Sequence, residues 1–168
     1  MKAASNSGPL IHLARIGMLS LLRQLYGEIL ITPKVEDEVV HKGKQKGYPD
    51  AFTVEQAIEV GWIRTVEITP PQRFAALAAQ AGLHPAEAEI IWLAHSRKIT
   101  ALLDDDPVRK FARLLGVKVR GSIGVIIAGA KRQLITKQKA LHALDQLAET
   151  MYLDTKTYRT ARKTLEKL

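Results

Sequence analysis

Residues 99–115 read ITALLDDDPVRKFARLL, and this stretch decides both the fold class and the kind of site that we expect. The apolar run Ile99–Leu103 predicts a short buried strand that ends in three consecutive carboxylates, Asp104–Asp106, before Pro107 opens a helical pattern. Adjacent carboxylates at a strand-to-helix junction repel one another, so the cluster is costly unless a cation or a set of hydrogen-bond donors neutralises it.

A simpler interpretation of the same residues is a capped helix start. It places one aspartate at the N-cap, Pro107 at the first helical position and acids in the first turn. We assign the N-cap to Asp106, which leaves Asp104 and Asp105 to be explained. Two further features favour a cation site. They are a second acidic pair, Glu87 and Glu89, and the polar pair Asn6-Ser7 after the first apolar segment.

Length and composition indicate an ordinary globular protein. The 168 residues are 46% hydrophobic and 25% charged, which suits one domain, residues 1–168, with a substantial core. No apolar run approaches the roughly 18 to 20 residues that span a bilayer, and no export signal is visible at the N-terminus. Cysteine is absent, which excludes disulfides and thiolate chemistry and fits a reducing compartment. We therefore expect a cytoplasmic protein without a membrane partner.

The net charge is +8, with a sequence pI near 9.8. A basic chain with a local acidic cluster indicates a polyanionic partner handled around a cation site, although a solvated basic surface is the simpler alternative. Four cations near the acidic segments are candidate RNA contacts, namely Arg109, Arg120, Lys131 and Arg132. The chain also ends in a basic helix predicted at about 155–168.

Short strand patterns alternate with helical patterns along the chain. Strands are predicted at 2–5, 28–32, 62–68, 99–103 and 117–119. Helices are predicted from Pro9 to Ile16 and at 18–26, 33–41, 54–60, 72–80, 85–97, 107–115, 121–133, 137–149 and 155–168, with a polar loop at 42–51. This alternation predicts a three-layer α/β/α sandwich with a mainly parallel sheet, whose ligand site lies beyond the carboxyl ends of the strands.

Three long segments resemble the PIN-domain family. Residues 3–40 (AASNSGPLIHLARIGMLSLLRQLYGEILITPKVEDEVV) are similar to the start of one subfamily, in which S-P-L-I or a similar run follows an Asp or Asn. Residues 84–94 (HPAEAEIIWLA) resemble its G-E-A-E-A-I-x-L-A helix. Residues 102–135 (LLDDDPVRKFARLLGVKVRGSIGVIIAGAKRQLI) resemble its L-L-D-D stretch followed by G-[ST]-x-G. The resemblance covers nearly the whole chain, in order and with compatible spacing.

The resemblance implies a metal-dependent nuclease. PIN domains are α/β/α folds in which acidic or polar residues converge on Mg²⁺ or Mn²⁺, and many small members are VapC-like endoribonuclease toxins. Carried over by position, the catalytic residues are Asn6, Glu87, Asp104, Asp105 and Ser122, and the metal ligands are Glu87, Asp105 and Asp104. Asn6 stands where the family has its first acid, and Ala86 replaces the glycine before Glu87. The implied partners are single-stranded or structured RNA, a small antitoxin protein and a second copy in a homodimer.

The chemistry of the residues agrees with this assignment. Mg²⁺ prefers oxygen ligands and keeps several waters, so one or two carboxylates suffice. Glu89 lies about 200° around the helix from Glu87, so both cannot face one ion, and we predict that Glu87 points inward. The histidines are scattered along the chain, and we interpret His12 and His95 as surface or packing residues.

Other functions remain open alternatives. A receiver-type domain requires an acidic pair near the first strand, where this chain has Asn6-Ser7. A haloacid-dehalogenase-like phosphatase requires D-x-D-x-[TV] after that strand, which is missing. Asn6 removes one negative charge from the metal site, so a PIN fold that binds RNA or protein without cutting is the main alternative. The apolar helices at 10–25 are either a dimer surface or part of the core.

Overall fold

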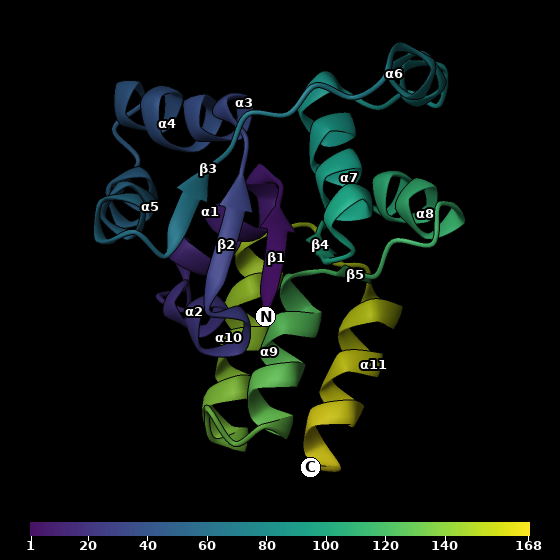
Figure 1. Cartoon of the computed structure of the whole chain (residues 1–168). Coiled ribbons are helices and arrows are strands. Elements are labelled where there is room, and N and C mark those ends of the chain that lie inside the picture. Colours follow the sequence, from purple (N-terminus) through teal and green to yellow (C-terminus); the bar gives the residue numbers. More distant parts are fainter.

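The centre of the molecule is a sheet of five strands in the order β3-β2-β1-β4-β5, and every pairing is parallel (Figure 1). The computed structural model describes all 168 residues. The strands are β1 Lys2–Ser5, β2 Glu28–Ile31, β3 Ile63–Thr65, β4 Thr100–Leu102 and β5 Val119–Arg120. This sheet confirms the predicted parallel α/β architecture, and the strands are short runs of mainly buried aliphatic residues because helices cover both faces.

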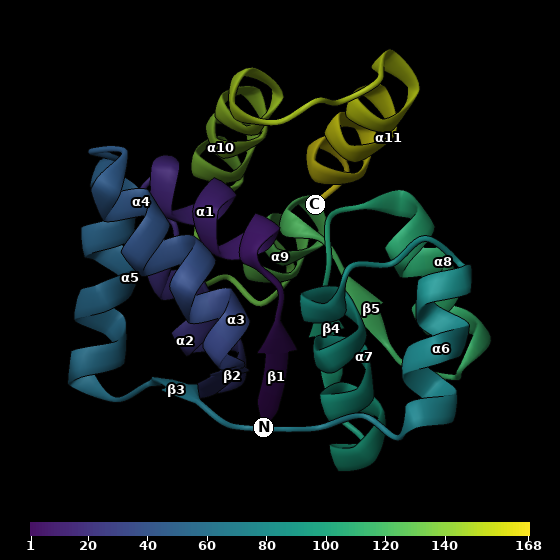
Figure 2. The same ribbon diagram turned by 90° about the horizontal axis from the view of Figure 1, so that it is seen from above.

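The helices divide between the two faces of the sheet. They are α1 Ser7–Arg15, α2 Ser20–Tyr26, α3 Pro33–Glu36, a π-helical turn η1 Asp37–His41, α4 Lys42–Gln45, α5 Pro49–Val60, α6 Gln72–Gln80, α7 Pro85–Arg97, α8 Asp106–Leu114, α9 Ser122–Lys131, α10 Lys137–Thr150 and α11 Thr155–Glu166. Figure 2 shows α1, α9 and α10 gathered on one side of β1, and α7 on the other. Connections between parallel strands are right-handed, so the direction in which the chain moves across the sheet decides which face a connecting helix covers. The chain moves one way from β1 to β3 and the other way from β4 to β5, so both faces are covered.

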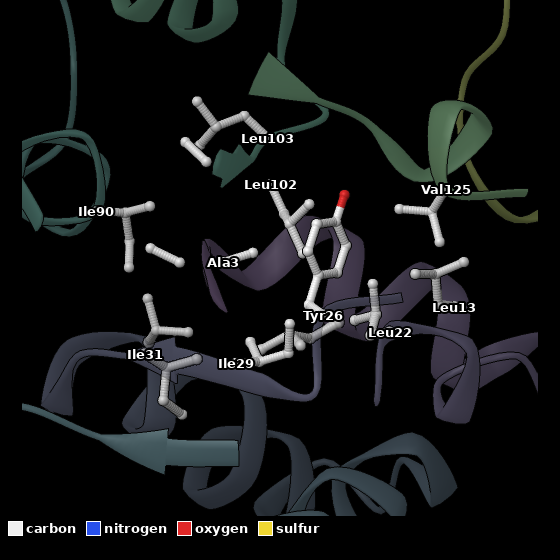
Figure 3. Close-up of a cluster of buried hydrophobic side chains, with 14 of the residues drawn as sticks. Ala3, Leu13, Leu22, Tyr26, Ile29, Ile31, Ile90, Leu102, Leu103 and Val125 are labelled. Atoms are coloured by element: carbon white, nitrogen blue, oxygen red, sulfur yellow. The ribbon is translucent and has the colours of Figure 1, made fainter. Parts of the chain in front are cut away.

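One continuous core lies between these layers (Figure 3). Apolar residues of β1, β2 and β4 contact those of α1, α2, α7 and α9, and Leu13, Leu22 and Ile90 are fully buried there. The apolar faces of the helices at 10–25 therefore belong to the core and do not form a free surface for dimerisation. No helix is both long enough and apolar enough to cross a membrane.

The segment predicted as a polar loop, 42–51, is largely helical. The helix that begins at Pro33 continues through η1 and α4, and α5 begins at Pro49. Gly43 is buried, and a Cβ added to it would lie 2.8 Å from the Cβ of Ala51. The loop prediction was wrong because we interpreted the glycines and lysines of this segment as signs of a loop. Gly43 instead permits a close contact between two helices, which a larger residue at this position would prevent.

The strand order places a topological switch point between β1 and β4. The chain extends from β1 through β2 to β3 in one direction, then returns and continues through β4 to β5 in the other. A crevice forms beyond the carboxyl ends of strands at such a point, because the connections on the two sides leave in opposite directions. Asn6 directly follows β1, and its N–H donates to the carbonyl of Leu102 at 3.1 Å, two residues before Asp104. The fold therefore brings Asn6 and Asp104 to the same edge.

Candidate active site at the carboxyl edge of β1 and β4

Asp104 is the most deeply placed carboxylate at this edge, with a side chain that is 9% exposed. Its Oδ1 accepts from the N–H of Ser122 at 2.6 Å, and its Oδ2 accepts from the Ser122 hydroxyl at 2.6 Å. The Nδ1 of His12 lies 2.7 Å from Oδ2. Ser122 opens α9, so Asp104 also faces the free N–H groups and the positive end of that helix dipole.

These donors hold Asp104 in its ionised form. Burial acts most strongly and raises the pKa of Asp104, but the hydrogen bonds from His12 and from the hydroxyl and N–H of Ser122 together outweigh it. The pKa of Asp104 therefore lies below its ordinary value. An ionised carboxylate only accepts hydrogen bonds, so the Nδ1 of His12 must carry the hydrogen.

Two glycines flank this carboxylate, and only Gly121 is needed for a close approach of the backbone. A Cβ on Gly121 would lie 3.0 Å from Asp104 Oδ1 and 3.3 Å from the carbonyl oxygen of Leu103. A Cβ on Gly8 would lie 3.6 Å from Asp104 Oδ2, an ordinary contact distance. Gly121 thus allows the N–H of Ser122 to reach the carboxylate, whereas the position of Gly8 leaves space for a methyl group.

The neighbouring acids have separate local roles. Asp105 is the N-cap of α8, and its Oδ1 accepts from the N–H of Val108 at 3.3 Å. Asp106, which we predicted as the N-cap, is instead the first residue of the helix and pairs with Lys110 at 3.1 Å. Because each acid of the triplet has its own partner, local donors relieve the repulsion that we expected between them.

The capping role of Asp105 predicts a contrast between two replacements. Asp105→Asn is expected to change the free energy of unfolding by less than about 0.5 kcal/mol, because asparagine is an equally good N-cap. Asp105→Ala is expected to cost about 1 kcal/mol, because the N–H of Val108 loses its acceptor. Urea denaturation of both variants measures the difference. Equal stabilities would show that the 3.3 Å contact contributes nothing.

The acidic pair on α7 faces opposite to our prediction. Glu87 is only half-buried, and its Oε2 accepts from the backbone N–H of His84 at 2.8 Å, which closes a capping box at the start of the helix. Glu89 is the buried member of the pair, with a side chain that is 11% exposed, and it contacts the Nζ of Lys34 on α3. The sequence could not reveal this, because the cation that compensates Glu89 comes from a helix 55 residues earlier in the chain.

Asn6 has a side chain that is free to take a ligand. It occupies the N-cap position of α1 without a capping hydrogen bond. Next to it, the hydroxyl of Ser7 donates to Glu38 Oε2 at 2.8 Å, which brings an exposed carboxylate of η1 to the same edge. Thr32, which follows β2 beside Asn6, is fully buried, and its hydroxyl has no partner.

A cleft of about 760 Å³ opens beside Asp104. Its walls come from the Asp triplet and Arg109, from β5 and the first turns of α9, and from the segment Met151–Asp154 before α11. Arg109 lies over Gly121, with its Nη1 3.4 Å from the position of a Cβ there, and its buried Nε has no hydrogen-bond partner. Among the predicted RNA contacts, Arg109 is therefore placed at the cleft with donors to spare.

The other three predicted RNA contacts lie differently. Arg120 also lines the cleft, but its guanidinium donates to the hydroxyl of Tyr26 at 2.9 Å and lies near the ring of that residue. Arg132 lies 3.4 Å from the carbonyl of Leu25. Lys131 is exposed at the far end of α9, about 13 Å along the helix from Ser122. The contact of Lys131 with RNA stays a prediction.

Sequence reasoning missed His12, Glu38 and Lys34. A signal for His12 exists, because it lies one helical turn after Gly8 and therefore on the face of α1 that meets Asp104. Glu38 and Lys34 belong to the helical segment that follows β2, and the strand order alone would place that segment at this edge. We had expected His12 to be a surface or packing residue, and it is instead a hydrogen-bond partner of Asp104, with its Nδ1 2.7 Å from Oδ2.

The oxygen donors fit a hard divalent ion held by few protein ligands. No three acidic or histidine side chains converge closely enough to form a complete cage, because Glu87 and Asp105 cap their helices. Asp104 is ionised and nearly buried at the carboxyl edge of β1 and β4, and the amide of Asn6 has no capping partner. Mg²⁺ is commonly bound through one or two carboxylates, with water and substrate phosphate completing its shell.

Residues 2–167 match the family profile described as "DUF3368: PIN domain". The chain belongs to this PIN-domain family. A solved PilT N-terminus domain protein from the hyperthermophilic archaeon Sulfolobus solfataricus P2 is similar to it, with a TM-score of 0.51 and 21% identity. That match covers 74% of this chain and 90% of the other, and at this identity it shows the fold alone. No curated protein gives a significant match.

Membership in the family confirms the predicted PIN fold and indicates the general class of function. PIN domains are typically metal-dependent nucleases, and they generally use divalent ions. The VapC-like subfamily, the identity of the ion and the roles of individual residues in this chain stay predictions.

Proposed function

We propose that this PIN domain is a Mg²⁺- or Mn²⁺-dependent endoribonuclease that hydrolyses single-stranded RNA, and that it is the toxin of a toxin–antitoxin pair. The observation that carries the proposal is Asp104, an ionised and nearly buried carboxylate at the switch point, next to Asn6 and at the wall of a cleft. The lowered pKa keeps this carboxylate charged at neutral pH, as a ligand for a divalent ion must be.

The side chains of this edge divide the work of phosphodiester hydrolysis. Asp104 is the principal acidic ligand in this proposal, and Asn6, Asp105 and Glu87 are further oxygen donors. The bound ion would offset charge on the phosphate and lower the pKa of a water. Ser122 and His12 orient Asp104 through their hydrogen bonds, and Arg109 offers donors to a phosphate oxygen at the cleft.

Cleavage of RNA tests this proposal directly. Purified protein is incubated with a mixed-sequence single-stranded RNA in Mg²⁺ or Mn²⁺, with a matched sample in excess chelator. We expect cleavage with either ion and none in chelator. Cleavage that persists in chelator would refute the metal dependence, and intact RNA in both ions would refute the nuclease.

A non-catalytic PIN module is the second candidate function. Every carboxylate near the switch point already has a protein partner: Lys34 contacts Glu89, and His12 is hydrogen-bonded to Asp104 where a metal would otherwise act. Asn6 adds no charge of its own. This candidate predicts RNA binding without cleavage and no effect of divalent ions on the melting temperature.

Asn6→Asp is expected to tighten metal binding. A second carboxylate beside Asp104 attracts a divalent ion, and the same charge repels Asp104 when no ion is bound. Titration calorimetry with Mn²⁺ should therefore give a lower Kd, while the metal-free variant should melt earlier than the unchanged protein. An unchanged Kd would mean that residue 6 does not face the ion.

The antitoxin and the homodimer are part of the same proposal. A short neighbouring reading frame whose product inhibits cleavage on co-purification would identify the antitoxin. We place the dimer surface outside α1 and α2, since most of their apolar residues are buried within one chain.

A further inference from the structure

The outer face of α11 carries a stripe of four cations that no protein group neutralises. They are Lys156, Arg159, Lys163 and, at the C-cap, Lys167. All four are exposed, and none takes part in an ion pair. At 100° per residue they fall within an arc of about 80°, and at 1.5 Å per residue they extend over about 16 Å. We call these residues the α11 stripe.

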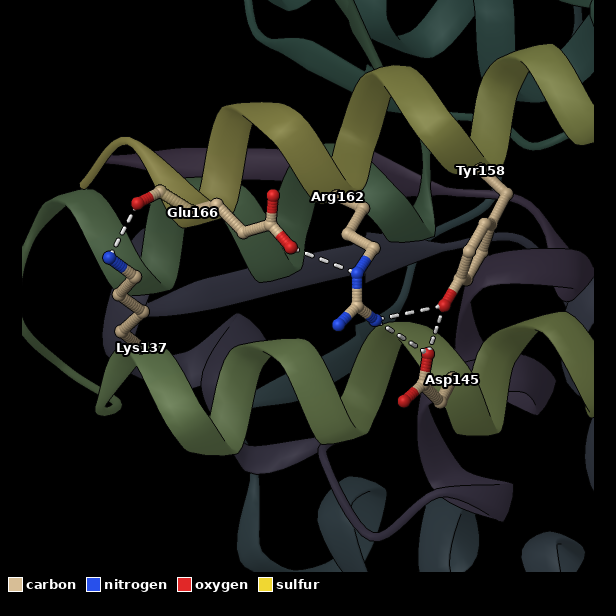
Figure 4. Close-up of polar contacts among 5 residues, drawn as sticks. All are labelled: Lys137, Asp145, Tyr158, Arg162 and Glu166. Carbon is tan, nitrogen blue, oxygen red and sulfur yellow. Dashed lines mark hydrogen bonds and ion pairs between the residues drawn. The ribbon is translucent and has the colours of Figure 1, made fainter.

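The inner face of the same helix holds α11 in place without the stripe. Ala161 and Leu165 are its buried residues. Figure 4 shows Arg162 between Glu166, at 3.0 Å, and Asp145 of α10, at 3.7 Å, with Tyr158 bonded to both Arg162 and Asp145. Packing and ion pairing thus use the residues that face α10, so the stripe is not needed to attach the helix.

The first turn of α11, where the stripe begins, adjoins the cleft beside Asp104. Thr157, in the first turn of α11, lines that cleft together with Met151–Asp154. Within this segment, the ring of Tyr152 is 92% exposed, the most exposed large hydrophobic side chain in the protein. An exposed aromatic ring therefore lines the cleft on the segment that leads into α11.

We propose that Tyr152 and the α11 stripe form a track that binds the sugar-phosphate strand of a single-stranded RNA as it leaves the cleft. Four cations neutralise phosphates without reading sequence, and the ring stacks on a base. At a stacked spacing of about 3.4 Å, the stripe is as long as four to five nucleotides. The inference deepens the proposed function, on which it rests for the identity of the strand.

An anionic membrane is the less suitable partner for this face. Helices that lie on membranes present apolar residues beside their cations. The apolar residues of α11, Ala161 and Leu165, are buried against the rest of the protein, and the exposed positions around the stripe are mainly threonines and charged residues.

The test measures binding of a fluorescent single-stranded RNA of about 12 nucleotides in chelator, where the proposed nuclease does not cut. The stripe variant is K156Q/R159Q/K163Q/K167Q. Its control, R23Q/K46Q/R73Q/R97Q, removes the same charge from four exposed cations without ion pairs that are scattered over other elements. Tyr152→Ala is paired with Tyr152→Phe, which keeps a ring for stacking. Circular dichroism melting verifies that each variant is folded.

We expect the stripe variant to bind at least tenfold more weakly than the control variant. The slope of the logarithm of the binding constant against the logarithm of the salt concentration should fall in magnitude by about 2 to 3, since each neutralised phosphate contributes roughly 0.7. Tyr152→Ala should bind the RNA at least about fivefold more weakly, and Tyr152→Phe should bind as the unchanged protein does. Equal losses in the stripe and control variants would overturn the track, because net charge would then account for binding.

Two further outcomes separate this inference from the proposed function. Stripe-dependent binding without cleavage after Mn²⁺ is added would keep the track and refute the nuclease. Cleavage with an unchanged KM in the stripe variant would keep the nuclease and overturn the track. The track is also overturned if the stripe is needed for binding to phosphatidylserine vesicles but not to RNA.

Discussion

Asp104→Asn is expected to abolish RNA cleavage and to destabilise the protein at neutral pH by about 2 to 4 kcal/mol. The carboxylate accepts three hydrogen bonds from Ser122 and His12. An asparagine offers one acceptor oxygen, and its NH₂ group must face one of these donors, so charge-assisted bonds worth about 1.5 to 3 kcal/mol each are lost. Removal of the principal acidic ligand should lower the cleavage rate at least about a hundredfold.

The pH dependence of the free energy of unfolding distinguishes the contribution of the charge of Asp104 from the contribution of its shape. Its folded pKa is lowered, so its stabilising contribution is complete above the unfolded pKa of about 3.9 and is lost as the pH falls through the lower, folded value. The stability difference between the unchanged protein and Asp104→Asn should therefore be constant from pH 7 to about pH 5. It should shrink below about pH 4, as urea denaturation at each pH can measure.

Asp106→Asn is the matched control for this prediction. Asp106 is exposed and pairs only with Lys110 on the same helix, a contact worth a few tenths of a kcal/mol. This variant should retain cleavage and nearly full stability. If Asp104→Asn cleaves RNA at the rate of Asp106→Asn, Asp104 is not part of the active site.

Gly121→Ala is expected to reduce both stability and cleavage, although it adds only one methyl group. The new Cβ would lie 3.0 Å from Asp104 Oδ1 and 3.3 Å from the carbonyl oxygen of Leu103. The carbonyl belongs to the backbone and cannot rotate away, so α9 must shift and the bond from Ser122 to Asp104 must lengthen. We expect a loss of about 1 to 3 kcal/mol, as for other overpacked sites, and a large loss of activity.

Gly8→Ala tests the same carboxylate from its other side. The added Cβ would lie 3.6 Å from Asp104, and alanine is the better helix former, so stability should be unchanged or slightly higher. Thermal melting and a cleavage assay of the two variants provide the comparison. Equal behaviour of Gly8→Ala and Gly121→Ala would mean that the close approach at Gly121 has no role in holding Asp104.

Local sequence signals determined most of the secondary structure. Pro85 begins α7 as predicted, and the predicted span 85–97 agrees with the observed one. Short runs of β-branched and aliphatic residues predicted strands where strands occur, because these side chains suit a sheet that is buried on both faces. Alternation of strands and helices then determined the parallel sheet, and the polar residues at the ends of β1 and β4 indicated where the site lies.

Only the tertiary structure decided which polar side chains meet at that site. His12 and Asp104 are 92 residues apart, and Lys34 and Glu89 are 55 residues apart, so no local pattern could pair them. Periodicity could not choose between Glu87 and Glu89 either, because an acid near a helix start serves equally as a cap or as a buried ion-pair partner. Propensity and capping act over a few residues, whereas the burial and neutralisation of a charge depend on every element that packs around it.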